Sequence, residues 1–224
     1  MAAITISRQY GSGGRKVALK VSELLGWPVF DKRLMIDVAS EVGLLPADVI
    51  DFTEDDYKVK NFWDRLLGSA RSAQVADVPS PMQITYSPVT ATTFTSEEMD
   101  QEGAVLLVNR AIMHAYERGN VIIVGRGGQI ILQDEPDVLH VRVRAPMHVR
   151  MRRLAEYARI PAQDTLTIAQ QHDKAAIEYM RMYFDADWDD TNLYHMVINS
   201  GKLSTTAIAN LIVASAKQYL AMDD

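Results

Sequence analysis

The residues best suited to chemistry form a glycine-rich turn near the N-terminus, Gly11-Ser12-Gly13-Gly14-Arg15-Lys16. A β-branched stretch precedes the turn and a helical pattern follows it. Glycine allows positive φ angles that turn backbone N–H groups inward, and the start of a helix adds partial positive charge. This combination binds phosphate, so the turn is predicted to hold the phosphates of a nucleotide. A tight turn without a ligand is the alternative.

The turn departs from the P-loop pattern G-x-x-x-x-G-K-[ST]. With Gly13 aligned to the last glycine of the pattern, Arg8 stands at the first glycine, Gly14 at the lysine and Arg15 at the hydroxyl residue. Arg15, Lys16 and Arg8 are the candidates to supply the missing charge. A Rossmann dinucleotide site is excluded, because its pattern needs glycine where Lys16 stands.

Alternating strands and helices are predicted to position this turn. The predicted strands are residues 3–7, 28–30, 120–124, 138–143 and 195–199. Helices are predicted over residues 14–25 and 96–118, where apolar residues recur at helical spacing and a glycine follows each segment. The predicted fold is a three-layer α/β/α domain of the P-loop NTPase type, with a five-stranded parallel sheet and helices on both faces.

Composition limits the classes of function. The 224 residues suffice for one α/β domain with insertions, and the formal charge of −6 gives no overall attraction to nucleic acid or anionic membrane. The chain has no cysteine, which excludes disulfides and suits a cytoplasmic protein. The sequence shows no signal-peptide pattern and no apolar run of the ~20 residues that a spanning helix needs. Small-molecule partners are expected, and the oligomeric state stays open.

Residues 53–95 interrupt the alternation. After one short predicted helix over residues 62–67, this stretch is rich in serine, threonine and proline. A loop of this length inside a compact domain is usually a lid or a binding arm. The chain is therefore predicted to be a single kinase-like domain, residues 1–224, with 53–95 inserted as an acceptor-binding arm or mobile loop. A surface excursion without function is the alternative.

Several segments resemble the cytidylate kinase-like family, a branch of the P-loop nucleoside monophosphate kinases. The stretch ITISRQYGSGGR, residues 4–15, resembles the opening signature of that family, including the absence of the usual lysine. Residues 25–31 are similar to its second strand, whose last aspartate lies at the nucleoside monophosphate site, and residues 123–128 to its Gly-Arg motif, whose arginine contacts the acceptor. In true cytidylate kinases an aspartate follows that arginine, and here Gly127 stands in its place.

The C-terminal half carries the same resemblance. Residues 141–146 lead into an arginine-rich helix, as in the lid approach of these kinases, and residues 173–174, 179–181, 187–188 and 197–199 resemble the C-terminal signature. Ala176 departs from it, because relatives tend to carry an arginine there. The resemblance therefore implies a lid over about residues 150–183.

Phosphoryl transfer needs cations around two phosphate sites and no covalent step by the protein. The predicted catalytic cations are Arg15, Lys16, Arg126, Arg150 and Arg153. The predicted acceptor-binding residues are Asp31, Lys32, Arg33, Arg126, Lys174 and Arg181. Arg126 and Asp31 follow predicted strands, at the edge of the sheet where ligands bind. The alternatives are an N-cap role for Asp31 and solvated surface positions for the helical arginines.

The predicted function is ATP-dependent transfer of the γ-phosphoryl group to a CMP-like nucleotide or another small acceptor. Magnesium is the expected cofactor, with the hydroxyl of Ser12 as its protein ligand. The alternative is an inactive nucleotide-binding regulatory module, which the residues at positions 14, 15 and 176 favour. A nucleic-acid kinase or binder is disfavoured by the acidic composition.

Overall fold

The computed structural model describes residues 2–30, 101–158 and 160–220, and every structural statement below concerns these residues. The chain divides into two compact units, residues 1–30 with 112–224, and residues 31–111. Several predictions lie outside the described residues: the inserted arm 53–95, the short helix at 62–67, and the acceptor residues Asp31, Lys32 and Arg33. The sheet and the glycine-rich turn belong to the first unit.

Five parallel strands form one sheet in the order β2-β3-β1-β4-β5. They are β1 (Ala3–Arg8), β2 (Val29–Phe30), β3 (Val121–Val124), β4 (Val138–Arg144) and β5 (Met196–Asn199). All five predicted strands are confirmed, each with one end shifted by a residue. The central strand β1 is buried along nearly its whole length, as expected for a strand covered on both faces. The glycine-rich turn therefore leaves the middle of the sheet.

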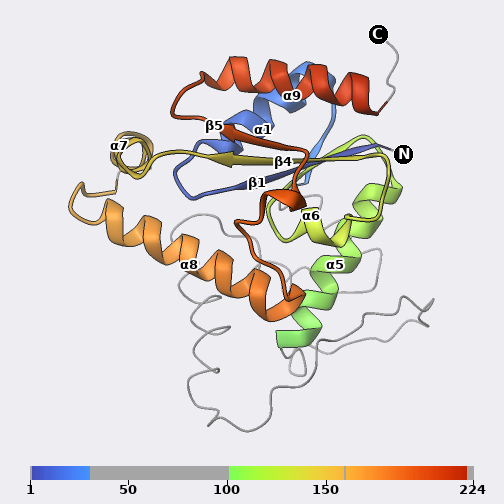
Figure 1. Ribbon diagram of the computed structural model, residues 1–224, viewed down its shortest axis with the longest axis horizontal. Coiled ribbons are helices and arrows are strands. Elements are labelled where there is room, and N and C mark those ends of the chain that lie inside the picture. Colours follow the sequence, from blue (N-terminus) through green and yellow to red (C-terminus); the bar gives the residue numbers. More distant parts are fainter. Residues whose placement is uncertain (1, 31–100, 159, 221–224) are drawn as a thin grey trace, which may run out of the picture. The chain divides into compact units, whose positions relative to one another are not determined.

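Helices cover both faces of the sheet, which confirms the predicted three-layer fold. Figure 1 shows α1 (Gly14–Leu25) and α9 (Thr205–Tyr219) on one face, and α6 (Gly128–Ile131) and α8 (Thr165–Phe184) on the other. The buried stripe of α1 packs with α9 and the sheet to form the main apolar core. Helix α1 has the predicted bounds and ends at Gly26, whose φ is +70°.

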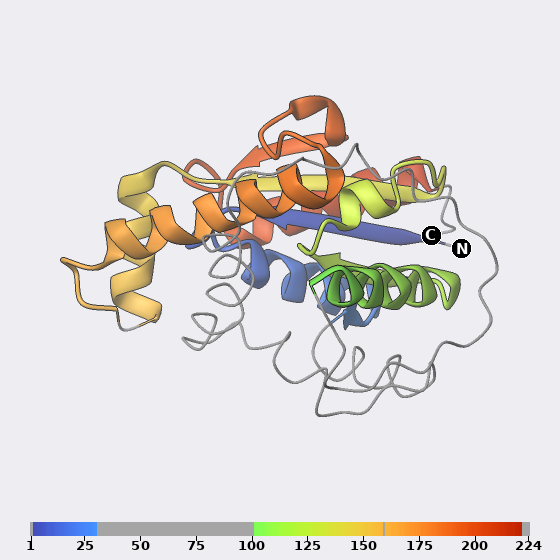
Figure 2. The ribbon, with the colours of Figure 1, turned by 90° about the horizontal axis from the view of Figure 1, so that it is seen from below.

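The remaining helical segments complete the connections between the strands. Helix α5 (Gln101–Glu117) matches the later part of the helix predicted at 96–118, and its residues from Ile112 onward belong to the first unit. Helix α7 (Met147–Tyr157) and the start of α8 lie beyond the ends of β1 and β4 (Figure 2). A short 3-10 turn, η2 (Thr191–Leu193), precedes β5. Within the described part of the chain, no helix has the length and apolar character needed to cross a membrane.

Candidate functional site: the glycine-rich loop

The glycine-rich loop connects β1 directly to α1. Gly11 and Gly13 have φ angles of +76° and +83°, which only glycine adopts readily. Gly13 is the N-cap residue of α1, and no side chain caps the helix. The first-turn N–H groups of α1 therefore have no side-chain cap, and the macrodipole makes this end of the helix positive. The structure thus brings Gly11, Ser12, Gly13 and Gly14 into a turn with the geometry of a phosphate cradle.

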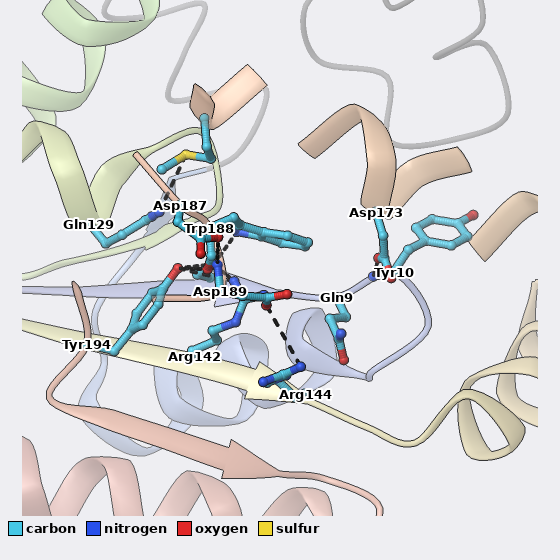
Figure 3. Close-up of polar contacts among 12 residues, drawn as sticks. Gln9, Tyr10, Gln129, Arg142, Arg144, Asp173, Asp187, Trp188, Asp189 and Tyr194 are labelled. Carbon is cyan, nitrogen blue, oxygen red and sulfur yellow. Dashed lines mark hydrogen bonds and ion pairs between the residues drawn. The ribbon is translucent and has the colours of Figure 1, made fainter. Parts of the chain in front are cut away.

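Arg150 of α7 holds the loop at Tyr10. Its side chain is 2% exposed, its Nε donates to the Tyr10 carbonyl oxygen at 2.7 Å, and its Nη1 donates to Asp173 of α8 at 2.6 Å. Asp173 also accepts from the backbone N–H of Tyr10 at 3.3 Å (Figure 3). The Tyr10 ring stacks on His172, with 3.9 Å between ring centroids. The predicted catalytic Arg150 therefore serves, in this structure, to position the loop.

Arg153 holds the next part of the loop. Its Nη1 donates to the Ser12 carbonyl oxygen at 2.6 Å and to the Ser200 hydroxyl at 2.9 Å, and its Nη2 donates to the Ser200 carbonyl oxygen at 2.7 Å. The Ser200 hydroxyl itself donates to the same Ser12 carbonyl. The guanidinium group thus joins the loop to the turn that follows β5, and it lies beside Gly13, where an added Cβ would be 3.5 Å from Nη1.

The predicted cations of the first turn of α1 lie on the surface. Arg15 and Lys16 are both exposed. The ammonium group of Lys16 lies 3.4 Å from the centroid of the Tyr157 ring, in a cation–π contact with the end of α7. Lys16 is therefore directed toward α7 in this structure.

Arg126 follows β3 in an unusual backbone conformation. Gly125, Arg126 and Gly127 all have positive φ angles, of +76°, +59° and +75°. A non-glycine residue rarely adopts this region, and such outliers cluster at functional sites. Arg126 also acts on Tyr179 of α8: burial raises the pKa of the Tyr179 hydroxyl, and the positive charge of Arg126 opposes that rise. The structure thus sets Arg126 between the end of β3 and α8.

The position after Arg126 has no room for a side chain. A Cβ added at Gly127 would lie 2.8 Å from Cε2 of Phe184, the last residue of α8. In true cytidylate kinases an aspartate follows the arginine. In this chain the Phe184 ring lies where the side chain of that aspartate would begin. This part of the site is therefore apolar where an aspartate would have made it acidic.

A buried polar cluster that was not predicted from the sequence lies at the end of β1, beside the glycine-rich loop. Arg142 of β4 is 1% exposed, and its Nη1 donates to Ser7 at 3.2 Å and to Tyr194 at 3.1 Å. Its Nη2 donates to Asp189, and its guanidinium carbon lies 4.0 Å from the Trp188 ring centroid (Figure 3). From the sequence, Arg142 had no predicted role beyond the family resemblance of residues 141–146. The aromatic and acidic residues at 187–189 were the signal for a buried arginine.

The two predicted acceptor cations of α8 are exposed. Lys174 is 73% exposed on its side chain, and its ammonium group lies 3.7 Å from the carboxylate of Glu178 one turn later. Arg181 lies in the last turn of the helix. The structure places both on the surface of α8, and their predicted role in binding an acceptor stays a prediction.

The hydroxyl of Ser12, the predicted magnesium ligand, is fully buried and has no hydrogen-bond partner among the described residues. Its role as a metal ligand stays a prediction. In the part of the chain that the structure describes, no group of three histidine, aspartate or glutamate residues could hold a metal ion.

Comparison with known proteins identifies relatives of the chain. A family model described as the cytidylate kinase-like family matches residues 3–202. A cytidylate kinase of Staphylothermus marinus is 29% identical over 108 residues, covering 46% of this chain and 58% of the relative. A cytidylate kinase of Aeropyrum pernix is 26% identical over 113 residues, covering 50% of this chain and 65% of the relative. The match thus spans less than two thirds of the length of these two relatives.

A solved structure shares the fold over nearly the whole length. An uncharacterized protein from Eubacterium ventriosum aligns with a TM-score of 0.65 at 22% sequence identity. The alignment covers 97% of this chain and 98% of that chain. This similarity concerns the fold.

Proposed function

Because the chain belongs to the cytidylate kinase-like family, we propose that it transfers the γ-phosphoryl group of ATP to a nucleoside monophosphate or another small acceptor. The family is kinase-like, and the fold is that of the P-loop NTPases. The observation that carries the proposal is the turn from Gly11 to Gly14, which leaves the central strand and opens α1 with two glycines at positive φ. Its open backbone N–H groups suit the phosphates of a donor nucleotide.

The reaction requires positioning and charge neutralisation. An acceptor oxygen forms a bond to the γ-phosphorus, the bond to the oxygen that bridges the β- and γ-phosphorus atoms breaks, and ADP leaves. ATP enters as its magnesium complex. The loop holds the donor phosphates, Arg15 and Lys16 add positive charge near the helix start, and Arg126 neutralises charge on the acceptor side. Arg150 and Arg153 keep the loop in shape through the contacts described above.

The acceptor is expected to be small and anionic. Asp31, Lys32, Arg33, Lys174 and Arg181 are its proposed contacts, together with Arg126. Gly127 and the Phe184 ring leave no carboxylate at the position that true cytidylate kinases use, so selection of cytosine by that group is absent. The acceptor panel should therefore contain purine and pyrimidine monophosphates as well as CMP. Cytoplasmic activity is expected, since a chain without cysteine suits a reducing compartment.

A regulatory nucleotide-binding module is the second candidate. It is favoured by the buried hydroxyl of Ser12 and by Arg15, which stands where a P-loop carries the magnesium-binding hydroxyl. Such a module would bind ATP through the same loop but release no ADP.

The two candidates are separated by ADP production in a coupled assay with ATP, magnesium and a panel of monophosphates. The proposed enzyme forms ADP only when an acceptor is present. Arg126→Ala should lower that rate by about 100-fold or more, as loss of a cation from a phosphoryl-transfer site does. The matched control is Lys20→Ala, which removes a half-buried cation of α1 that pairs with Glu23. Tight ATP binding without acceptor-dependent ADP would select the regulatory module.

A further inference from the structure

The side chain of Arg8 fills the space beside two glycines. A Cβ added at Gly14 would lie 2.5 Å from the Cβ of Arg8 and 3.1 Å from its Cγ. A Cβ added at Gly125 would collide with Nη1 of Arg8 and lie 3.4 Å from its Cζ. The stem of Arg8 therefore occupies the place of a side chain at position 14, and its guanidinium group reaches the residue that follows β3.

This contact makes side chains at positions 8 and 14 mutually exclusive. A standard P-loop has glycine at the position of Arg8 and lysine at the position of Gly14. In this chain the glycine and the cation have exchanged places. The absence of the lysine is thus the steric consequence of an arginine six residues earlier, and the loop keeps one long cationic side chain at this pair of positions.

The guanidinium group lies where phosphate is expected. Arg8 ends β1, and Gly125 follows β3, which pairs directly with β1. The backbone N–H of Gly125 donates to the Ile6 carbonyl oxygen at 3.0 Å, so the ends of the two strands are held together. The carboxyl ends of adjacent parallel strands are the edge at which such sheets bind ligands. The Arg8 side chain reaches across this edge to Gly125, the residue before Arg126.

We propose that Arg8 binds the β- and γ-phosphates of ATP and replaces the P-loop lysine. Its planar guanidinium group can hold two phosphate oxygens at once, which a lysine ammonium group cannot do with the same geometry. Lys16 contacts Tyr157, and Arg153 is bonded to Ser12 and Ser200, so their observed contacts point elsewhere. The proposal rests on the ATP site of the proposed function, and it does not depend on turnover.

The first test measures nucleotide affinity by titration calorimetry. Arg8→Gln keeps most of the stem and removes the charge, so it should bind ATP about 10- to 100-fold more weakly than the unchanged chain, as loss of a charge-assisted hydrogen bond predicts. AMP lacks the β- and γ-phosphates, and its affinity should change by less than about threefold. Arg8→Lys should retain most of the ATP affinity. Lys20→Ala is the control for loss of a cation from the same part of the fold.

The second test exchanges the two positions. Gly14→Lys alone should lower the melting temperature, because the new Cβ meets the stem of Arg8. The double variant Arg8→Gly with Gly14→Lys restores the first glycine and the lysine of the P-loop pattern. It should recover both the melting temperature and an ATP affinity within about fivefold of the unchanged chain. Arg8→Gly alone should bind ATP as weakly as Arg8→Gln does.

Several results would overturn the proposal. They are ATP affinity of Arg8→Gln within about twofold of the unchanged chain, an equal loss for ATP and AMP, or no detectable ATP binding by the unchanged chain. A double variant no tighter than Arg8→Gly would also contradict it. ATP binding that follows the predicted order without transfer to any acceptor would refute the proposed function and leave the role of Arg8 standing.

Discussion

Arg150 of α7 and Asp173 of α8 form a buried ion pair, 2.6 Å between Nη1 and Oδ2, directly against the glycine-rich loop. Together the two side chains bond both backbone polar groups of Tyr10, the residue before the first loop glycine. A Cβ added at Gly11 would lie 3.2 Å from the Arg150 carbonyl oxygen, so α7 and the loop are in close contact. The two helices of the predicted lid region therefore anchor the loop as well.

Breaking this ion pair should cost more stability than breaking a surface pair on the same helix. Asp173→Ala leaves the Arg150 guanidinium buried without its carboxylate and should lower the free energy of unfolding by about 2–3 kcal/mol, toward the lower end of the range for buried pairs because Asp173 is partly exposed. Glu178→Ala removes an exposed partner of Lys174 and should cost less than about 0.5 kcal/mol. Urea denaturation of both variants measures the difference. Equal losses would mean that the loop does not depend on the buried pair.

Replacement of Gly127 by aspartate should destabilise the protein. The backbone there has φ +75°, which costs about 1–2 kcal/mol for a residue with a Cβ, and the new side chain meets the Phe184 ring. The combined loss is expected to be about 2–4 kcal/mol in the free energy of unfolding. Adding Phe184→Ala removes the collision, so Gly127→Asp should cost less in that background. A melting temperature unchanged by Gly127→Asp would contradict the packing described here.

Acidification should destabilise the fold through His140. Burial, with a further contribution from His195, lowers the pKa of the His140 imidazole to about 4, against 6.5 in an unfolded chain. Between these values the unfolded chain binds a proton that the folded chain does not, so stability is complete above pH 6.5 and falls as the pH drops toward 4. The expected loss from pH 7.5 to pH 5 is about 2 kcal/mol from this residue alone.

The pH dependence of unfolding is measured for the unchanged chain and for His140→Gln. His140 bonds Thr5 at 2.7 Å through Nδ1, so glutamine keeps a polar group at the site while removing its titration. His195 also has a pKa lowered by burial and accepts from the His140 backbone N–H, so part of the slope should persist in the variant. An identical slope in both proteins would show that His140 does not titrate as described.

Arg153 should affect nucleotide binding without touching the nucleotide. Arg153→Met keeps the stem of the side chain but removes its bonds to the Ser12 carbonyl oxygen and to Ser200. Among the described residues, the Ser12 carbonyl then keeps only the Ser200 hydroxyl as a partner, so the loop is held less firmly at its centre. ATP affinity should fall by about 10-fold, the value of one charge-assisted hydrogen bond. Arg152→Met, an exposed neighbour on α7, is the control and should bind ATP normally. If Arg153→Met binds ATP as tightly as its control, the loop needs no support from Arg153.

Sequence patterns predicted the fold well because the elements are built from local signals. The apolar spacing and Gly26 defined both ends of α1, and β-branched runs defined the strands. Local sequence patterns say less about whether a charged side chain is buried than about where helices and strands lie. Arg142, Arg150 and Arg153 gave the same signal as surface arginines, and their hydrogen-bond partners lie 19 to 141 residues away in the chain. Only three-dimensional proximity shows that their guanidinium groups are engaged.

Only the part of the candidate site that depends on local sequence was predicted. The positive φ angles of Gly11 and Gly13 follow from the glycine pattern. The contact between Arg8 and Gly14 does not, since it depends on how the turn folds back on the end of β1. In the sequence, Gly127 was noted only as the absence of an aspartate. The Phe184 ring that fills the space of a side chain there comes from the end of a helix 57 residues later in the chain.

Transfer of the labelled phosphoryl group from ATP to an acceptor is the most direct test of the proposed function. The chain is incubated with magnesium and ATP labelled at the γ-phosphorus, together with CMP, UMP, AMP, GMP and their deoxy forms, and the products are separated. We expect label in a nucleoside diphosphate. The rate of its transfer from ATP should be lowered by Arg8→Gln and by Arg126→Ala and left unchanged by Lys20→Ala. Label found only in ATP and inorganic phosphate, with every acceptor tested, would contradict the proposed function.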